Sequence, residues 1–351
     1  MAAWALYRLP HADHYVRIRQ TSGEPEALLS CAQLNGREGF VVAPFDIRPD
    51  QPVLLIRPDA VEAYPLSGSP GISGKSGKSG KSGISSPSPS YAVDFANFHA
   101  QLLSGTFRKI VLARCADEST ACPLAPEELF FRACQRYPRL FISLVYTSLS
   151  GYWLTATPEI LLENDGPQWR TIALAGTMKL EADQLQGEGE TVTWSTKNIQ
   201  EQRYVATYLT ECLERFTGDF REEGPRTVRA ANLVHLRSDF TFTLPDSLHV
   251  GDLLHALHPT PAVCGLPKQD AFRFITHNEH TPRRYYSGFM GPLSICSPLP
   301  TTHLYVSLRC MNIEGCQYHL YAGGGLLKDS ILEQEWLETE AKLETMRSLL
   351  Y

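Results

Sequence analysis

A run of three glycines and a pair of glutamates near the end of the chain together suggest a site for an anion and a metal ion. Backbone without Cβ atoms, as in Gly323–Gly325, can approach a ligand closely and offer its N–H groups to an anion. Glu335 and Glu338 are three residues apart, so they share one face of a helix. Paired carboxylates suit a hard cation such as Mg²⁺. A loop followed by a solvated helix, with Glu338 and Lys342 as a surface ion pair, would give the same pattern.

Two charged residues further upstream have apolar neighbours. Glu201 lies one turn before Val205 on the apolar face of a predicted helix, where a carboxylate is costly unless it is paired or bound to a metal. Lys109 begins an apolar strand, and a lysine in a low-dielectric site becomes a usable base because its charged form is disfavoured. A buried salt bridge for Glu201 and a strand-end lysine that reaches water are the structural alternatives.

Three other polar residues stand next to a proline or at the end of an apolar strand, so the local backbone limits where their side chains can point. Glu159 follows Pro158 at a strand bend, and the fixed proline could aim its carboxylate. Arg309 ends an apolar strand and suits bidentate capture of a carboxylate. His255 and His258 are three apart, but no further ligand follows at zinc spacing, so His258 is interpreted as an orienting or hydrogen-bonding group. A solvated turn residue and a structural ion pair are the alternatives for Glu159 and Arg309.

The composition is that of an ordinary globular protein. The chain has 351 residues, of which 43% are hydrophobic and 20% charged, and it is long enough for one large domain or two. A net charge of -6 argues against a nucleic-acid partner, and it means that local groups must hold an anionic substrate. The first ten residues do not have the pattern of a signal peptide, and no apolar run is long enough to span a membrane.

The cysteines indicate a reducing compartment. None of the nine forms a CxxC pair, and most sit among apolar residues, so we expect buried thiols and a cytoplasmic location. The cysteines on which this prediction rests are Cys115, Cys122, Cys134, Cys212, Cys264, Cys296 and Cys310.

Residues 66–90 consist mainly of Gly, Ser, Pro and a repeated Gly-Lys-Ser triplet, and we predict a flexible insert there because the segment cannot bury a core. A phosphate-binding loop is excluded, since GxxxxGK[ST] is never satisfied at Gly74, Gly77 or Gly80. No second linker is visible, which favours a single domain, 1–351, interrupted by this insert.

Strands arranged in hairpins, with helices that do not alternate strictly with them, favour an α+β fold. Helices are expected at 92–103, 126–136 and 196–216. Strands are expected at 15–18, 39–43, 53–56, 108–114, 140–147, 152–163, 170–174, 286–290, 303–308 and 318–321.

Taken together and in order, these signals resemble the chorismate-utilising enzymes, and most closely the isochorismate synthases. The ordered set spans residues 107 to 346 and is far more specific than any one short motif. The segments that carry the resemblance are Lys109–Arg114, Ala156–Glu159, Ala175–Thr177, Lys197–Glu201, His258–Ala262, Tyr286–Gly288, Leu308–Cys310, Ala322–Gly325 and Glu335–Leu343.

The resemblance implies an α+β fold of large, mainly antiparallel sheets with flanking helices and an active site between two halves. It implies that Lys109 is the base that activates water for attack at C2 of chorismate, and that Glu159 is the acid that protonates the departing C4 hydroxyl. Mg²⁺ would be bound directly by Glu201 and Glu338 and through water by Glu335. The implied substrate contacts are Arg309, Tyr286 and the amides of Gly323, Gly324 and Gly325 at the pyruvyl carboxylate, with Thr177 and His258 bordering the ring.

The leading hypothesis is therefore an isochorismate synthase that serves menaquinone or siderophore synthesis and acts on chorismate as a monomer or weak dimer. A salicylate synthase, which also eliminates pyruvate, is the first alternative. A non-catalytic chorismate-binding subunit would need a broken base or acid, and both Lys109 and Glu159 are present. The aminodeoxychorismate branch carries a lysine just before the Gly-Thr pair, where this chain has Ala175.

Overall fold

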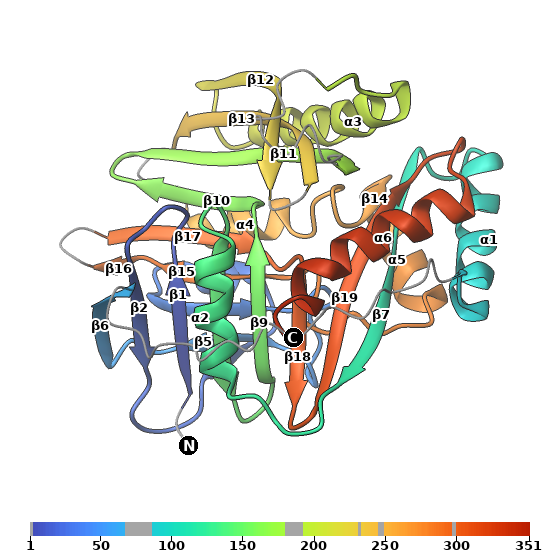
Figure 1. The fold of residues 1–351 in the computed structure, drawn as a ribbon. Coiled ribbons are helices and arrows are strands. Elements are labelled where there is room, and N and C mark those ends of the chain that lie inside the picture. Colours follow the sequence, from blue (N-terminus) through green and yellow to red (C-terminus); the bar gives the residue numbers. More distant parts are fainter. Residues whose placement is uncertain (1–2, 67–85, 180–191, 231–232, 245–248, 297–299) are drawn as a thin grey trace.

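The computed structural model describes residues 3–66, 86–179, 192–230, 233–244, 249–296 and 300–351. Two large sheets lie at the centre of the molecule and helices cover them, which confirms the α+β prediction (Figure 1). All the strand pairings found in the described part of the chain are antiparallel. Within the described residues, none of the helices combines the length and the apolar character needed to cross a membrane.

The first sheet has nine strands in the order β14-β7-β19-β18-β9-β8-β1-β2-β6. Their bounds are β14 Gly265–Leu266, β7 Lys109–Ser119, β19 Gln317–Leu326, β18 Cys310–Glu314, β9 Gly151–Thr157, β8 Phe141–Thr147, β1 Trp4–Arg8, β2 His14–Arg19 and β6 Ala60–Pro65.

The second sheet has ten strands: nine follow the order β12-β13-β11-β10-β17-β15-β4-β5-β3, and the tenth, β16, pairs with β17 beside them. Their bounds are β12 Phe220–Ala230, β13 Leu233–Thr243, β11 Gln168–Lys179, β10 Ile160–Asp165, β17 Pro300–Val306, β15 Phe289–Leu293, β4 Gly39–Ala43, β5 Val53–Ile56, β3 Glu26–Leu28 and β16 Ile295–Cys296.

The helices pack on the outside of the sheets, and α6 crosses strands β19 and β7 (Figure 1). Their bounds are α1 Pro89–Leu103, α2 Pro126–Arg136, α3 Thr196–Leu213, α4 Val250–Leu257, α5 Lys268–Asn278 and α6 Leu332–Arg347, with a short 3₁₀ helix at Cys31–Leu34. Helix α2 has the predicted bounds, because Pro126 suits the first turn.

The predicted insert, 66–90, ends too late at its C-terminal side. Helix α1 begins at Pro89, and the Ser88 side chain accepts a hydrogen bond from the Tyr91 backbone N–H as its N-cap. Residues 88–90 therefore belong to the start of helix α1 and not to the insert. The central part of the predicted insert, 67–85, lies outside the described residues.

The strand predicted over 152–163 is two strands in different sheets. Strand β9 belongs to the first sheet and β10 to the second, and the chain passes between the sheets at Pro158 and Glu159. Proline has no N–H for a strand ladder, so pairing ends there. Glu159 consequently lies where the two sheets meet.

The glycine run is part of a strand and not a loop. Gly323, Gly324 and Gly325 continue β19 and pair with Ala113, Leu112 and Val111 of β7. Strands β12 and β13 form a further hairpin, which was not predicted from the sequence. Its second strand contains His235, which faces the candidate site described below.

Segments from both ends of the chain share the same sheets and core. Strand β4 pairs with β15, and one core cluster contains Ala5 and Phe40 together with Tyr286 and Tyr321. This sharing supports the prediction of a single domain, which stays a prediction. Of the cysteines predicted to be buried, Cys134, Cys212, Cys264 and Cys310 are buried, whereas Cys115 is half-buried and Cys122 is exposed.

Candidate active site

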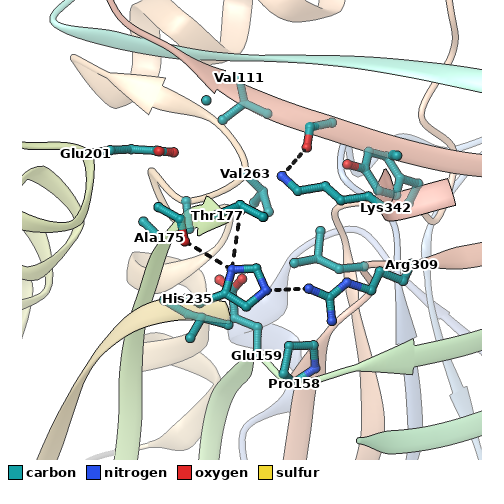
Figure 2. Close-up of a pocket in the computed structure, with 18 residues that line it drawn as sticks. Val111, Pro158, Glu159, Ala175, Thr177, Glu201, His235, Val263, Arg309 and Lys342 are labelled. Carbon is teal, nitrogen blue, oxygen red and sulfur yellow. Dashed lines mark hydrogen bonds between the residues drawn. The ribbon is translucent and has the colours of Figure 1, made fainter. Parts of the chain in front are cut away.

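A cavity lies where the two sheets approach each other. Strands β7 and β19 of the first sheet, strands β11 and β13 of the second, and helices α3 and α6 all contribute to its wall, as Figure 2 shows. The residues that line it are Val111, Pro158, Glu159, Leu174, Ala175, Gly176, Thr177, Glu201, His235, Ala262, Val263, Tyr286, Leu308, Arg309, Ala322, Gly323, Gly325 and Lys342.

Strand β19 lets carboxylates come close to its backbone because it carries glycines there. A Cβ atom on Gly325 would lie 2.0 Å from Oε1 of Glu201, a distance that no real contact allows. A Cβ atom on Gly324 would lie 3.3 Å from Oε2 of Glu335 and 3.6 Å from Oε1 of Glu338. Glu201 from α3, and Glu335 and Glu338 from the distant helix α6, therefore approach two successive glycines.

Lysines compensate the charge of each of these glutamates. Lys109 Nζ lies 3.2 Å from Glu201 Oε1, Lys197 contacts Glu335, and Lys342 Nζ lies 2.8 Å from Glu338 Oε1. Figure 2 shows Lys342 and Glu201 on the cavity wall.

The pKa values of the two buried glutamates, Glu201 and Glu335, are shifted in opposite directions. Burial opposes the ionisation of Glu201, but the charges of Lys109 and Lys197 outweigh it and lower the pKa of Glu201 below its usual value. Burial, together with the charge of Glu338, raises the pKa of Glu335.

Glu159 is the carboxylic acid of the site without a close cation. It makes no ion pair within 4.0 Å in the described part of the chain, and only 3% of its surface is exposed. Burial raises the pKa of Glu159 to about 8, although the charges of Lys109 and Arg309 act in the opposite direction. Glu159 is therefore mostly protonated at neutral pH and can donate a proton.

A histidine fixes the direction of Arg309. The Nη2 of Arg309 donates to His235 Nε2 at 2.5 Å, as drawn in Figure 2. Arginine cannot accept a hydrogen bond, so Nε2 is the acceptor and the proton of the imidazole is on Nδ1, which donates to the Gly176 carbonyl at 3.1 Å. Burial and the charge of Arg309 hold the pKa of His235 well below its usual value, which keeps the ring neutral.

Arg309 keeps one donor free. Its Nη1 is buried and has no hydrogen-bond partner among the described residues. Burial lowers the pKa of Arg309 to about 10, so the guanidinium stays charged at neutral pH. Its backbone has a φ of 47°, a region that a residue other than glycine adopts only when its surroundings impose it. A buried and unpartnered guanidinium nitrogen beside a cavity is suited to a carboxylate ligand.

The Ala175–Thr177 segment and Tyr286 complete the wall. The pairing of β11 with β13 shifts register between Ala175 and Thr177, and Gly176 takes a φ of 72° in this bulge. Bulges redirect side chains, and Thr177 Oγ1 lies 3.3 Å from His235 Nδ1. A Cβ atom on Gly323 would be 2.7 Å from the Tyr286 hydroxyl, so this glycine makes room for the tyrosine.

His258 does not line the cavity, contrary to the role that the sequence analysis gave it. Its Nε2 lies 3.0 Å from the carbonyl oxygen of Pro44, and its ring packs edge-on against Phe289. Burial lowers the pKa of His258 to about 3. The proline-rich segment contributes by its backbone instead, because the Pro261 carbonyl accepts a hydrogen bond from Lys109 at 2.8 Å.

Sequence reasoning missed three residues of the site. His235 shares its face of β13 with Arg237 and Asp239, so the alternation of this strand does not predict that it faces inward. Lys342 was predicted only as the surface partner of Glu338, and this pair does form. Lys342 also donates a hydrogen bond to the Gly323 carbonyl at 2.8 Å and lines the cavity. Lys197, the partner of Glu335, carried no signal of its own beyond its place near Glu201.

The carboxylate cluster fits a hard divalent cation by its chemistry. Glu201, Glu335 and Glu338 offer only oxygen ligands, and Oε2 of Glu335 is buried without a hydrogen-bond partner among the described residues. The three carboxylates do not come within 4.8 Å of one another in the described chain, where lysines neutralise them instead.

The comparisons with known proteins identify the family. The sequence pattern of the family described as "Chorismate binding enzyme" matches residues 81–351, and the chain belongs to this family of enzymes. The isochorismate synthase MenF of Escherichia coli K12 is 33% identical over 256 residues, which are 71% of this chain and 57% of that protein. The isochorismate synthase EntC of the same strain is 29% identical over 68% of this chain and 61% of its own length. The matched region thus spans about three fifths of these relatives.

The fold agrees with solved structures of the same class. The structure of MenF, the menaquinone-specific isochorismate synthase from Escherichia coli, superposes with a TM-score of 0.79 and 21% identity, over 99% of this chain and 89% of that one. Anthranilate synthase component I from Streptococcus pneumoniae superposes less completely, with a TM-score of 0.62 over 73% of this chain and 57% of that one.

We predict that Glu159→Gln makes stability less dependent on pH. The raised pKa of Glu159 means that the folded state keeps a proton that the unfolded state has lost, from pH about 4.5 up to about 8. The stabilisation from this proton is complete below the unfolded pKa and is lost as pH rises through the folded one. It amounts to a few kcal/mol at most, because one pKa unit corresponds to about 1.4 kcal/mol.

Thermal unfolding of both proteins between pH 5 and 9 measures this effect. The melting temperature of the wild type should fall more steeply over this range than that of the variant. Equal slopes would show that Glu159 is ionised in the folded protein at neutral pH.

Proposed function

We propose that the protein is an isochorismate synthase, which adds water at C2 of chorismate and releases the C4 hydroxyl. The observation that carries the proposal is the buried Glu159, whose pKa is raised, in the same cavity as the free donor of Arg309. Hydroxide is a poor leaving group, so its departure requires an acid, and an acid with a raised pKa is suited to give up its proton there. The names of the relatives MenF and EntC support the same activity.

Two cationic side chains would hold the substrate. Chorismate carries two carboxylates, and both Arg309 and Lys342 line the cavity. Arg309 is already oriented by His235, so its free Nη1 can take a carboxylate without losing another partner. Thr177, Tyr286 and the backbone of Gly323, Gly324 and Gly325 would then enclose the ring and the pyruvyl group.

Lys109 would take the proton from the attacking water. It is fully buried, and its only nearby groups of opposite polarity in the described chain are the Pro261 carbonyl and the Glu201 carboxylate. A lysine acts as a base only when it is neutral, so this role requires that Glu201 exchange Lys109 for another cation. The proton lost by the water and the proton given to the leaving hydroxyl balance, and the reaction is an isomerisation.

Glu201 and Glu338, with Glu335 through water, would hold Mg²⁺, which supplies a charge for the ring carboxylate of the substrate and aligns it. The ionised state of Glu201 supports this role, because a metal ligand must be deprotonated. The unpartnered Oε2 of Glu335 is available to a bound water.

The proposal extends to the pathway, the cellular location and the assembly of the protein. MenF is described as menaquinone-specific, which favours a role in menaquinone synthesis over a siderophore pathway. The eight cysteines whose side chains the structure describes are free thiols, which supports a cytoplasmic location. A monomer or weak dimer is retained as the expected assembly.

We predict that the purified protein with chorismate and Mg²⁺ forms isochorismate as its only product. Chromatography of the mixture over time separates isochorismate from salicylate and from unreacted chorismate. Salicylate that accumulates without a partner enzyme would assign the protein to the salicylate synthases. Unchanged chorismate at every Mg²⁺ concentration would favour a binding subunit instead.

We predict that Lys109→Met lowers kcat by roughly 10²–10⁴-fold, the usual contribution of a general base, with a smaller change in KM. Methionine has a similar volume, so the buried position stays filled. The exposed Lys328→Met is the matched control and should retain full activity. Wild-type turnover in the Lys109 variant would remove the role assigned to it.

We predict that Glu338→Gln raises the Mg²⁺ concentration needed for half-maximal activity by about tenfold or more, because a charged ligand is lost. Glu333→Gln changes an exposed glutamate of the same helix and serves as the control. Initial rates over a Mg²⁺ series measure the effect. A Mg²⁺ requirement that Glu338→Gln leaves unchanged would contradict the metal assignment.

A further inference from the structure

A second group of potential metal ligands lies on the same two strands, toward the ends that are remote from Lys109, and none of its members lines the cavity. Cys115 and Asp117 are two residues apart on β7, so their side chains share a face. His319 of β19 is the direct pairing partner of Asp117, and Tyr321 is that of Cys115. Asp117 is eight residues along β7 from Lys109, a separation of roughly 26 Å in an extended strand.

The three side chains already point toward one another. The ligand atoms of Cys115, Asp117 and His319 all lie within 4.8 Å of one another. Asp117 Oδ1 is 2.6 Å from His319 Nδ1 and 3.7 Å from Cys115 Sγ. Paired strands hold the backbone on both sides, so the ligands need little rearrangement to close on an ion.

The second nitrogen of the imidazole also has a carboxylate close to it. His319 Nε2 lies 3.8 Å from Glu314 Oε2. A metal-bound histidine commonly gives its other N–H to a carboxylate, which fixes the tautomer and the direction of the ring. Glu314 is placed to do this while Nδ1 of His319 faces Cys115 and Asp117.

The donor set differs in kind from the glutamate cluster. Thiolate, imidazole and carboxylate together suit a borderline cation such as Zn²⁺, whereas Mg²⁺ prefers oxygen ligands alone. The Asp117 side chain is 73% exposed, so an ion can reach the group from solvent. Three protein ligands on an open surface leave the fourth tetrahedral position to water.

We propose that Cys115, Asp117 and His319 bind one Zn²⁺ ion, with water as the fourth ligand and Glu314 supporting the histidine. A cysteine binds a metal ion as its thiolate, so the bound ion displaces the thiol proton of Cys115. The bound ion joins β7 to β19 at the ends remote from Lys109 and the glycines. It therefore stabilises the strand pair and is independent of the proposed reaction.

An ion pair between His319 and Asp117, with Cys115 nearby by chance, is the competing explanation. The two differ in whether the thiol takes part. Co²⁺ distinguishes them, because it replaces Zn²⁺ in such sites and a thiolate ligand gives it a charge-transfer absorption that nitrogen and oxygen ligands lack.

The test uses the full chain after treatment with a chelator, titrated with Co²⁺ alone and then with Zn²⁺ in competition. We expect one equivalent of Co²⁺ to produce the thiolate absorption, Zn²⁺ to abolish it, and Zn²⁺ to raise the melting temperature by several degrees. In Cys115→Ser and His319→Asn the Zn²⁺ affinity should fall by about 100-fold or more, since even supporting residues change affinity by about 10–100-fold.

The matched control is Cys122→Ser, which removes an exposed cysteine outside the group and should leave Zn²⁺ binding unchanged. Asp117→Asn alters an exposed side chain and provides a second variant should Cys115→Ser fail to fold. The absence of a thiolate absorption in the wild type would overturn the proposal. So would Zn²⁺ affinity that Asp117→Asn and His319→Asn leave at the wild-type value.

Discussion

The balance of buried charge at one end of strand β19 is the constraint on which the site depends. Four carboxylates and four basic side chains gather there, and moving such groups out of water is expensive unless each one is compensated. Three pairs form: Glu201 with Lys109, Glu335 with Lys197, and Glu338 with Lys342. Glu159 and Arg309 remain outside these pairs. Burial raises the pKa of Glu159, so this residue keeps its proton at neutral pH. Arg309 donates a hydrogen bond to the neutral ring of His235. Glu159 and Arg309 are therefore the groups outside the lysine–glutamate pairs. An acid-catalysed reaction of an anionic substrate needs both kinds of group, a proton donor and a cation.

Both sheets are needed to bring these groups together. The chain crosses from one sheet to the other at Glu159, and the glycines belong to the first sheet while His235 belongs to the second. Helix α3 carries Glu201, and α6 carries the other two glutamates. A change in the packing of one sheet on the other would therefore alter the site before it affected either sheet internally.

The sequence predicts those features of the fold and the site that depend on residues close together in the chain. The pattern of α2 predicted its bounds, and the spacing of Glu335 and Glu338 predicted that they share a helix face, from which both approach Gly324. The order of the motifs identified the family, which the comparisons confirm. The predicted α+β class is also correct.

What the sequence could not supply was direction and pairing. His258 and His235 both stand in apolar surroundings, and only the paths of their backbones decide that the first faces Pro44 and the second faces Arg309. The glycine run looked like a loop because strand propensity disfavours glycine, yet pairing with β7 overrides that preference. The lysine partners of the glutamates come from distant segments, and no local pattern specifies contacts of that kind.

The lack of space at Gly325 also bears on how such a cavity can change in evolution. A single methyl group there would displace Glu201, so this wall is fixed by sterics whatever the substrate. Other parts of the wall are apolar side chains, namely Leu174, Val263 and Leu308, and a change in their size removes no charged group. New specificities within this architecture should therefore arise by reshaping the apolar side while the glycine side stays as it is.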